Sequence, residues 1–177
     1  LTPVTTFAGG NNWKQVDCGA AYTVAIKTDG SLWTWGQNNV GQLGTNDSTS
    51  RSTPVTTFAG GTTWKSVSGS INNQVAAIKT DGTLWVWGGN SQGRLGLGPL
   101  DIGNKNTPVT TFAGGTNWKQ SSCGGEHTAA IKTDGTLWIW GQNYGNTPIN
   151  TFAGGNNWKQ VDCGSNFTAA IKYQPDP

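Results

Sequence analysis

Charge is scarce in this chain. Asp, Glu, Lys and Arg make up only 11% of its 177 residues, whereas an average soluble domain carries about 25%. There is one His and one Glu, and no run of Lys or Arg occurs. We therefore expect no nucleic-acid binding, because it needs clustered basic side chains. We also expect no enzyme, because general acid–base catalysis needs positioned titratable groups.

Long apolar runs and methionine are missing too. No segment approaches the length that a membrane-spanning helix needs, and no secretory signal pattern is visible. We therefore expect no membrane insertion and no transmembrane location. Because Met is absent, we expect the chain to be a processed form or a piece of a longer protein.

Cysteine is limited to three residues, which share one place in a repeat. Cys18, Cys123 and Cys163 each lie five residues after a repeated Trp, and Gly69 takes that place once. A position that accepts Cys or Gly predicts a small side chain in a tight space, so we expect buried thiols. The odd count argues against disulfides, and the spacing does not favour the alternative of a three-thiol metal site.

Repetition is what the chain has in abundance. The stretch Thr-Pro-Val-Thr-Thr-Phe-Ala-Gly-Gly or a close copy precedes a Trp-Lys pair four times, starting at Thr2, Thr53, Thr107 and Thr147. Such a period marks a tandem array, which decides the architecture. We expect one repeat domain over residues 1–177. Its units are 2–52, 53–106, 107–146 and a partial unit 147–177.

Gly and Trp are abundant as well, with 27 and 10 residues. Strand-like patterning in units of about 40 to 55 residues fits the blades of a β-propeller. We predict an all-β fold, a β-propeller of tandem four-stranded blades, with about three and a half to four blades in this chain. An isolated β-sandwich is the alternative, but near-identical repeats favour stacked units.

Each unit contains a predicted hairpin. In the first, Asp29-Gly30 separates two β-prone runs, which predicts a two-residue type I′ turn with Ile26 opposite Trp33. One face of the hairpin would then be bulky, and the other would carry Ala25 at its middle. We expect the Trp pair of one blade to pack on the Ala of the next.

The remaining strands follow from proline and from the alternation of side chains. Each Thr-Pro-Val segment is expected to be the outer strand of a blade, because Pro is tolerated at an edge. Each Trp-Lys segment is expected to be a short inner strand. The alternation predicts that six tryptophans lie in the core: Trp33, Trp35, Trp85, Trp87, Trp138 and Trp140.

A longer pattern carries a family resemblance. The third unit contains, in order, Cys123-Gly124, His127-Thr128-Ala129-Ala130, Asp134-Gly135 and Trp140-Gly141-Gln142-Asn143. In these features the chain resembles the regulator of chromosome condensation repeat family, in a phage or bacterial form. The resemblance covers nearly the whole chain. It implies a β-propeller, which in this family usually has about seven blades.

The chain departs from the family pattern in its third unit. That unit stops after Tyr144-Gly145 and lacks the Gly-Gln-Leu-Gly loop, and the family's His occurs only as His127. The ultraviolet-sensing members use a Gly-Trp-Arg-His-Thr motif, which is absent here. The members that exchange nucleotide on a small nuclear GTPase have more blades. The resemblance therefore implies neither activity for this chain.

The segments after each Trp-Gly vary most between units. Residues 38–50 and 90–105 differ strongly while the strands barely change, and variable loops on a fixed scaffold are where recognition normally occurs. We expect a protein partner to contact these segments. The candidate residues are Asn39, Arg51, Ser91, Arg94 and Tyr144.

These features favour a non-enzymatic propeller that acts as a scaffold or protein-binding module, without catalytic residues, cofactor or metal. Low-charge repeats rich in Asn, Thr, Gly and Trp indicate a structural or surface component of a phage virion or bacterial cell. We thus expect a virion, extracellular or cell-surface location. One alternative is a secreted propeller that inhibits an enzyme by binding it. Another is a carbohydrate-binding lectin, since Asn, Gln and aromatic residues such as Tyr144 suit sugars.

The strand count leaves the two ends incomplete. Leu-Trp-x-Trp strands occur three times, whereas the other three strand types occur four times each. Open ends would expose unpaired strand edges and an apolar face, which is unfavourable for a soluble monomer. We therefore expect self-association through the open ends or docking in a larger assembly. A four-bladed ring and a fragment of a longer propeller are the alternatives.

Overall fold

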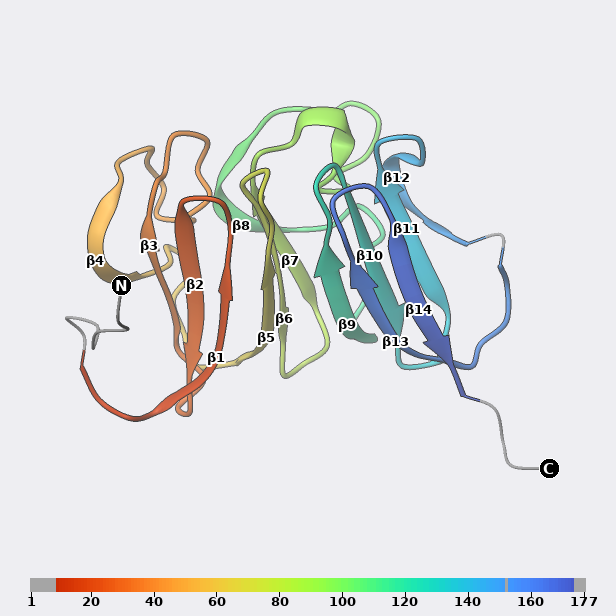
Figure 1. Ribbon diagram of the computed structural model, residues 1–177, viewed down its shortest axis with the longest axis horizontal. Coiled ribbons are helices and arrows are strands. Elements are labelled where there is room, and N and C mark those ends of the chain that lie inside the picture. The colour runs from red at the N-terminus through yellow and green to blue at the C-terminus, as the bar shows by residue number, and fades with distance from the viewer. Residues whose placement is uncertain (1–8, 152, 174–177) are drawn as a thin grey trace.

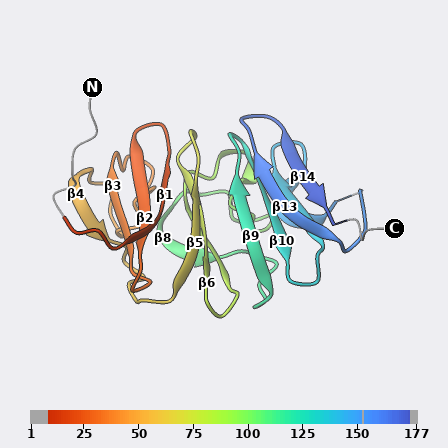
Figure 2. The ribbon, with the colours of Figure 1, turned by 60° about the horizontal axis from the view of Figure 1, so that its bottom comes forward.

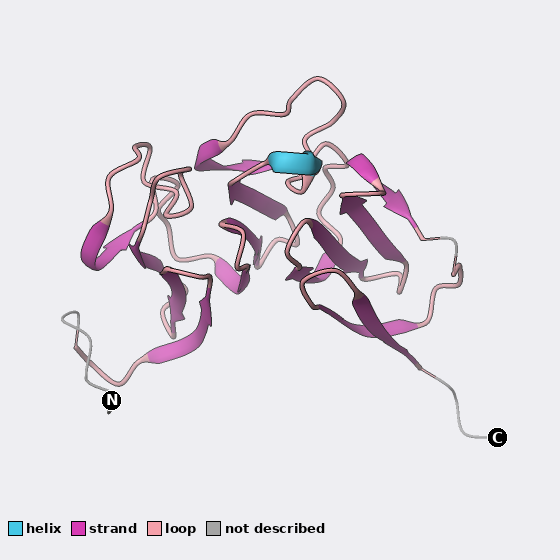
Figure 3. Cartoon of the chain, turned by 45° about the horizontal axis from the view of Figure 1, so that its top comes forward, coloured by secondary structure: helices cyan, strands magenta, loops and turns pink. Residues whose placement is uncertain are grey.

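The computed structural model describes residues 9–151 and 153–173. These residues form three four-stranded antiparallel sheets and one two-stranded sheet, which follow one another along the chain (Figure 1). The fold is the predicted all-β propeller architecture, with about three and a half blades. Figures 2 and 3 show the sheets fanned into an arc, with the first sheet and the two-stranded sheet at opposite ends.

Each blade contains four short strands. The first blade consists of β1 (Trp13–Cys18), β2 (Tyr22–Lys27), β3 (Leu32–Gly36) and β4 (Arg51–Thr56). The second consists of β5 (Trp64–Gly69), β6 (Gln74–Lys79), β7 (Leu84–Gly88) and β8 (Lys105–Thr110), with a short 3₁₀ turn, η1 (Ser91–Gly93), before β8. The third consists of β9 (Trp118–Cys123), β10 (His127–Lys132), β11 (Leu137–Gly141) and β12 (Gly145–Asn150). The half-blade consists of β13 (Trp158–Cys163) and β14 (Thr168–Lys172).

The strands of a blade pair in sequence order, from the Trp-Lys strand to the Thr-Pro strand. The outer position predicted for the Thr-Pro strand is therefore confirmed. This strand pairs with the Leu-Trp-x-Trp strand before it, so each Thr-Pro copy closes the blade that precedes it. The copy that starts at Thr2 lies outside the described residues.

The predicted hairpin register is wrong by one residue. Ile26 pairs with Leu32 instead of Trp33, and Ala25 pairs with Trp33. The β6–β7 and β10–β11 hairpins have the same register. Because directly paired residues share a face, each Trp pair lies on the face that also carries Ala, and the other face is aliphatic.

The turn chemistry explains this register. The loop of the first hairpin has three residues, and only its last, Gly30, has a positive φ, of 82°. The Asp29 carboxylate accepts hydrogen bonds from the N–H and the hydroxyl of Ser31, at 2.9 and 2.7 Å. This bonding favours a type I turn followed by a left-handed Gly over the two-residue type I′ turn.

Neighbouring blades pack a Trp-bearing face on an aliphatic face. Between the first two blades, Trp64 and Trp87 of the second blade contact a cluster with Val24, Ile26 and Leu32 of the first. The same arrangement recurs between the second and third blades. The Trp pair therefore packs on aliphatic side chains of the preceding blade, and the expected packing of Trp on Ala of the next blade is wrong.

The six predicted core tryptophans divide into two groups. Trp87 and Trp140 are fully buried, whereas Trp33, Trp35, Trp85 and Trp138 are half-buried. The first Trp of each pair lies beside a Lys of its own blade; the Nζ of Lys79, for example, lies 4.2 Å from the ring centroid of Trp85. The core prediction is thus confirmed for Trp87 and Trp140. Trp85 and Trp138 pack against the core while remaining half-buried, and Trp33 and Trp35 belong to no core cluster of the described residues.

Hairpin turns also join each blade to the next. The carbonyl of Gly82 accepts a hydrogen bond from the N–H of Trp118 in the third blade, at 3.0 Å. Gly82 has a φ of 81°, and a Cβ there would collide with the carbonyl oxygen of Thr116. The Asp-Gly turn therefore requires Gly both for its own conformation and for the approach of the next blade.

The three thiols differ in exposure. All are free; Cys123 is buried, Cys163 is half-buried and Cys18 is exposed. The expectation of buried thiols is therefore confirmed for Cys123 and wrong for Cys18, because none of the described residues forms a blade against that side of β1. Among the described residues, no helix combines the length and the apolar character that crossing a membrane requires.

Candidate partner-binding site on the loop face

One end of the blades carries the long loops. The turns between the first and second strands of each blade lie at this end, at the top of Figure 1. The connections from the third strand to the outer strand lie there too. We call this surface the loop face. Its turns are 19–21, 70–73, 124–126 and 164–167, and its connections are 37–50, 89–104 and 142–144.

A buried Asn holds the base of each long connection. Asn38 accepts a hydrogen bond from the N–H of Leu43 at 2.9 Å, and Asn90 accepts one from the N–H of Leu95 at 3.0 Å. The Asn90 amide also donates to the carbonyl of Asp101 at 2.9 Å. These bonds satisfy buried backbone groups, so the loops can vary in sequence at their tips while their bases keep one conformation.

Arg94 ties the second blade to the third. Its guanidinium donates to the carbonyls of Gly89 and Gly125 and pairs with the Glu126 carboxylate at 2.7 Å. Asn72 donates to the other Glu126 oxygen, also at 2.7 Å. Burial lowers the pKa of Arg94, and the charge of Glu126 opposes that shift. The network therefore holds turns of two blades at a fixed separation.

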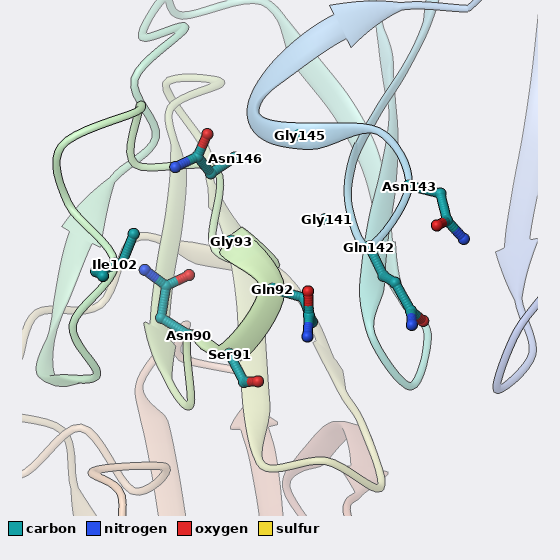
Figure 4. A pocket seen from close by; sticks show the side chains of 10 residues that line it. All are labelled: Asn90, Ser91, Gln92, Gly93, Ile102, Gly141, Gln142, Asn143, Gly145 and Asn146. Atoms are coloured by element: carbon teal, nitrogen blue, oxygen red, sulfur yellow. The ribbon is translucent and has the colours of Figure 1, made fainter.

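Three pockets adjoin on the loop face. The axial pocket of about 260 Å³ is lined by Cys18, Gly69, Ser70, Ile71, Cys123, Gly124, Gly125, Cys163, Gly164 and Ser165. The Tyr144 pocket of about 510 Å³ is lined by Asn72, Glu126, His127, Gln142, Asn143, Tyr144 and Asn166. The η1 pocket of about 460 Å³ is lined by Asn90, Ser91, Gln92, Gly93, Ile102, Gly141, Gln142, Asn143, Gly145 and Asn146 (Figure 4).

The pockets form a continuous row. The axial and Tyr144 pockets use consecutive residues of the same three turns, and the Gly125 N–H bonds the Ser165 carbonyl at 2.9 Å between them. The Tyr144 and η1 pockets share Gln142 and Asn143. Partner groups bound in neighbouring pockets would therefore lie close together.

Each pocket combines polar groups with one exposed apolar or aromatic side chain, and the Tyr144 pocket has the most polar lining. Ile71 in the axial pocket is 55% exposed, Tyr144 is 44% exposed, and Ile102 in the η1 pocket is 71% exposed. Such side chains are available for contact with a partner, while the amides and backbone groups around them can form directional hydrogen bonds.

Left-handed backbone occurs on two sides of the η1 pocket. Gln92 has a φ of 61° and Asn143 has a φ of 68°. Non-glycine residues adopt this conformation at a cost of about 1 kcal/mol or more, although Asn tolerates it better than Gln. Residues held in this way often occur where side chains must point in a set direction for binding.

The sequence-based candidates fall into three environments. Ser91 lines the η1 pocket and Tyr144 lines the Tyr144 pocket, so the structure brings these two to one row. Asn39 is exposed on the connection of the first blade, and Arg51, the first residue of β4, pairs with Asp47 of that connection at 2.6 Å. Neither residue lines any of the three pockets. Arg94 is only 7% exposed, and its guanidinium bonds groups within the chain.

Sequence analysis missed several residues of the row. Gln142 and Asn143 belong to the repeat motif, which indicated the fold and no binding role, and Asn166 lies in the turn before β14. Glu126 and His127 carried a signal, because they are the single Glu and the single His of the chain. Burial lowers the pKa of His127, and its Nε2 lies 2.8 Å from the Thr168 hydroxyl.

The axial pocket brings the three cysteines to one cavity. Burial raises the pKa of Cys123 to about 12, so its thiol is protonated at neutral pH and is a poor metal ligand. Within residues 9–151 and 153–173, no group of three or more His, Cys, Asp or Glu side chains is placed to hold a metal ion.

Known proteins share both the repeat and the fold. Residues 29–76 and 81–131 match the Regulator of chromosome condensation (RCC1) repeat, and residues 13–42 and 118–146 match a second form of that repeat. The chain belongs to the RCC1 repeat family. The phylogenetic range of similar proteins includes animals, plants and yeast.

Three relatives illustrate the similarity in sequence. The chain is 34% identical over 129 residues to the human X-linked retinitis pigmentosa GTPase regulator, covering 73% of this chain and 13% of that protein. It is 32% identical over 131 residues to the Ultraviolet-B receptor UVR8 of Arabidopsis thaliana, with coverages of 72% and 29%. It is 30% identical over 144 residues to the human E3 ubiquitin-protein ligase HERC2, with coverages of 78% and 3%.

Solved structures confirm the fold. Human WBSCR16 superposes with a TM-score of 0.77 and 21% identity, over 90% of this chain and 45% of that chain. Prp20p of Saccharomyces cerevisiae superposes with a TM-score of 0.76 and 19% identity, over 94% and 45%. The chain therefore spans less than half the length of each of these relatives and structures.

Proposed function

We propose that this RCC1-type chain is a non-enzymatic module that binds a protein partner through its loop face. The observation that carries the proposal is the row of adjoining pockets, each lined in part by Ile71, Tyr144 or Ile102. Protein interfaces combine a few apolar or aromatic anchors with a polar surround. The row offers three such anchors on a scaffold that the Arg94 network holds rigid.

The positions of four lysines support a protein partner over nucleic acid. Lys27, Lys79 and Lys132 each place Nζ between 4.0 and 4.9 Å from the centroids of two Trp rings of their own blade. Lys172 lies over Trp158 in the same way. These ammonium groups are engaged in cation–π contacts, whereas nucleic-acid binding requires basic groups that neutralise phosphates.

The surroundings of Glu126 and His127 support a binding module over an enzyme. The Glu126 carboxylate is held between Arg94 and Asn72, and His127 meets a Thr hydroxyl instead of a carboxylate. A general base needs a proton to abstract within hydrogen-bond reach and an orienting partner. These contacts hold both side chains in place and give neither of them such a pairing.

The proposal includes a biological setting. The near-identical, low-charge repeats favour a structural or surface component of a phage virion or bacterial cell, and inhibition of an enzyme by loop-face binding is the alternative. Mass spectrometry of purified particles and of cell-surface fractions tests the setting. Recovery only with a soluble target enzyme would favour the inhibitor.

Partner binding is expected to protect the loop face from amide hydrogen exchange. In the complex, residues 89–104, 124–126 and 142–144 should exchange more slowly, because the partner covers these turns. Ile102→Ala with Ile71→Ala should weaken binding by at least about tenfold, since each removes an anchor. Phe58→Ala, an equally exposed apolar side chain outside the row, is the control. Protection confined to the strands would contradict the proposal.

We also propose self-association through the edges of β1 and β13. Inside the propeller, the Gln15 amide donates to the Val67 carbonyl at 2.7 Å and accepts from the Val67 N–H at 3.1 Å. Asp17 accepts from the N–H of Gly69 at 3.0 Å. Gln120 and Ser122 repeat these contacts with the half-blade. At these two junctions an inner strand bonds the next one through two side chains, whereas β5 bonds β9 through Ser68.

Among residues 9–151 and 153–173, no further inner strand packs against the outer sides of β1 and β13, and these two sides carry the two halves of this contact. On β13, Gln160 and Asp162 occupy the same positions and are exposed. On β1, Val16 is 62% exposed, whereas its equivalents Val67 and Val161 are 3% and 1% exposed. In the proposed assembly, β1 of a second copy packs against β13. It bonds Gln160 and Asp162 in the way that β5 bonds Gln15 and Asp17.

Self-association should depend on concentration and on the β13 edge. Light scattering of the 177-residue chain at micromolar concentration should give masses above the 18.6 kDa of one copy. Gln160→Ala combined with Asp162→Ala should return the mass to one copy, whereas Lys159→Ala, on the same strand, should not. A folded chain whose mass stays at one copy over the whole concentration range would refute self-association.

A further inference from the structure

Three residues that have no identical counterpart in the other repeat units line one pocket. Glu126 is the single Glu of the chain and His127 is the single His. Tyr144 lies where the third unit lacks the long connection of the first two. All three line the Tyr144 pocket, and the His127 and Tyr144 rings lie 6.2 Å apart. In a chain of near-identical units, this coincidence of unique residues marks a specialised site.

The Tyr144 pocket offers no free charge. None of its seven lining residues is Lys or Arg, and the only carboxylate, Glu126, is neutralised by Arg94 at 2.7 Å. Burial disfavours the charged form of His127 by lowering its pKa. Phosphate and carboxylate ligands would lack a cation here, and a cationic ligand would meet a carboxylate that is already paired. The pocket therefore favours an uncharged ligand.

The polar groups of the pocket are suited to hydroxyls. Gln142, Asn143 and Asn166 supply amides that both donate and accept, and Figure 4 shows the Gln142 and Asn143 amides directed away from η1. Asn72 and Arg94 fix the Glu126 oxygens as acceptors. A hydroxyl can donate to a carboxylate and also bond an amide, so a ligand with several hydroxyls satisfies this set.

Tyr144 adds an apolar surface beside these groups. Its ring is 44% exposed and is supported by the His127 ring. The C–H face of a sugar ring can pack on an aromatic ring through dispersion contacts while its hydroxyls reach the amides. The volume of about 510 Å³ lies within the range of small-molecule sites, about 300–1,000 Å³.

The geometry points to a small neutral saccharide as the ligand of the Tyr144 pocket. Tyr144 packs on the sugar ring, Gln142, Asn143 and Asn166 bond its hydroxyls, and Glu126 accepts from one of them. The site does not depend on the protein-binding proposal, because it needs only one pocket of the row and a ligand that fits inside it.

The test is an array of neutral mono- and disaccharides that includes glucose, galactose, mannose and N-acetylglucosamine. The 177-residue chain should bind at least one of them. Titration followed by NMR should locate the sugar through chemical-shift changes of Tyr144 and His127. Tyr144→Ala and Asn166→Ala should each weaken binding by at least about tenfold. Tyr144→Phe should keep most of the affinity, because the ring is retained.

A matched control separates the site from general effects on the chain. Tyr173 is also exposed, at 59%, and lines a separate depression with Lys119 and Asp134, so Tyr173→Ala should bind the sugar unchanged. Binding of no neutral saccharide would overturn the assignment, as would equal affinity of Tyr144→Ala and the original chain. A protein partner that protects the loop face while no saccharide binds would overturn the saccharide site and leave the protein-binding proposal supported.

Discussion

Replacing Trp87 by Ala is expected to lower the free energy of unfolding by about 3–5 kcal/mol. The indole is fully buried between the first two blades, and its Nε1 donates to the carbonyl of Gln42 at 3.0 Å. Truncation leaves a cavity between the blades and removes the hydrogen-bond partner of that carbonyl. Urea denaturation should show a lower midpoint with an unchanged slope.

The repeat supplies a matched control for this substitution. Trp35 occupies the same position in the first blade but is only half-buried. Trp35→Ala should therefore cost clearly less than Trp87→Ala, although the local sequences are nearly the same. Equal losses for the two variants would mean that packing against the preceding blade does not stabilise Trp87.

Replacing Arg94 by Ala should lower the unfolding free energy by about 1–3 kcal/mol, because it leaves buried carbonyl groups without a donor. The ion pair itself adds less, since the Glu126 side chain is 28% exposed. Arg94 is 7% exposed, and its loss leaves the carbonyls of Gly89 and Gly125 without this donor and Glu126 with Asn72 as its remaining partner. Thermal unfolding monitored by tryptophan fluorescence measures this loss. Amide exchange should also accelerate in residues 124–126, because Arg94 holds that turn.

Two further variants show whether burial causes the effect. Arg51 pairs with Asp47 on a more exposed part of the first loop, so Arg51→Ala should change stability by less than about 1 kcal/mol. Gln42 occupies the place of Arg94 in the first blade and is fully buried, so Arg94→Gln should cost less than Arg94→Ala. An Arg94→Ala variant as stable as Arg51→Ala would exclude a central role for the network.

The sequence predicted the architecture well because its signals are local and repeated. Four copies of one pattern predict stacked four-stranded units, and Pro in each Thr-Pro strand predicts an outer edge. The turn was harder, since Asp-Gly fits both a two-residue and a three-residue loop. The hydrogen bonds that Ser31 donates to the Asp29 carboxylate decide between them. The register of every Trp pair follows from that choice.

The candidate site was predicted only in part. Sequence variation located the loops, and Ser91 and Tyr144 lie in the row of pockets. Arg94 was expected to face a partner, but it is buried because Glu126 comes within reach only when the third blade packs on the second. Asn166 enters the Tyr144 pocket from the half-blade for the same reason. Such neighbours are distant along the chain, so no spacing predicts them.

The strand Trp-Lys-Gln-Val-Asp-Cys occurs twice, as β1 and as β13. Its sequence alone determines that both copies are short inner strands paired with an Ile-Lys strand in the same register. Its sequence does not determine their surroundings, since Val16 is 62% exposed and Val161 is 1% exposed. Strand pairing and turns depend on nearby residues, whereas burial depends on which blade lies alongside. Only the tertiary structure therefore decided which copies became core, edge or binding surface.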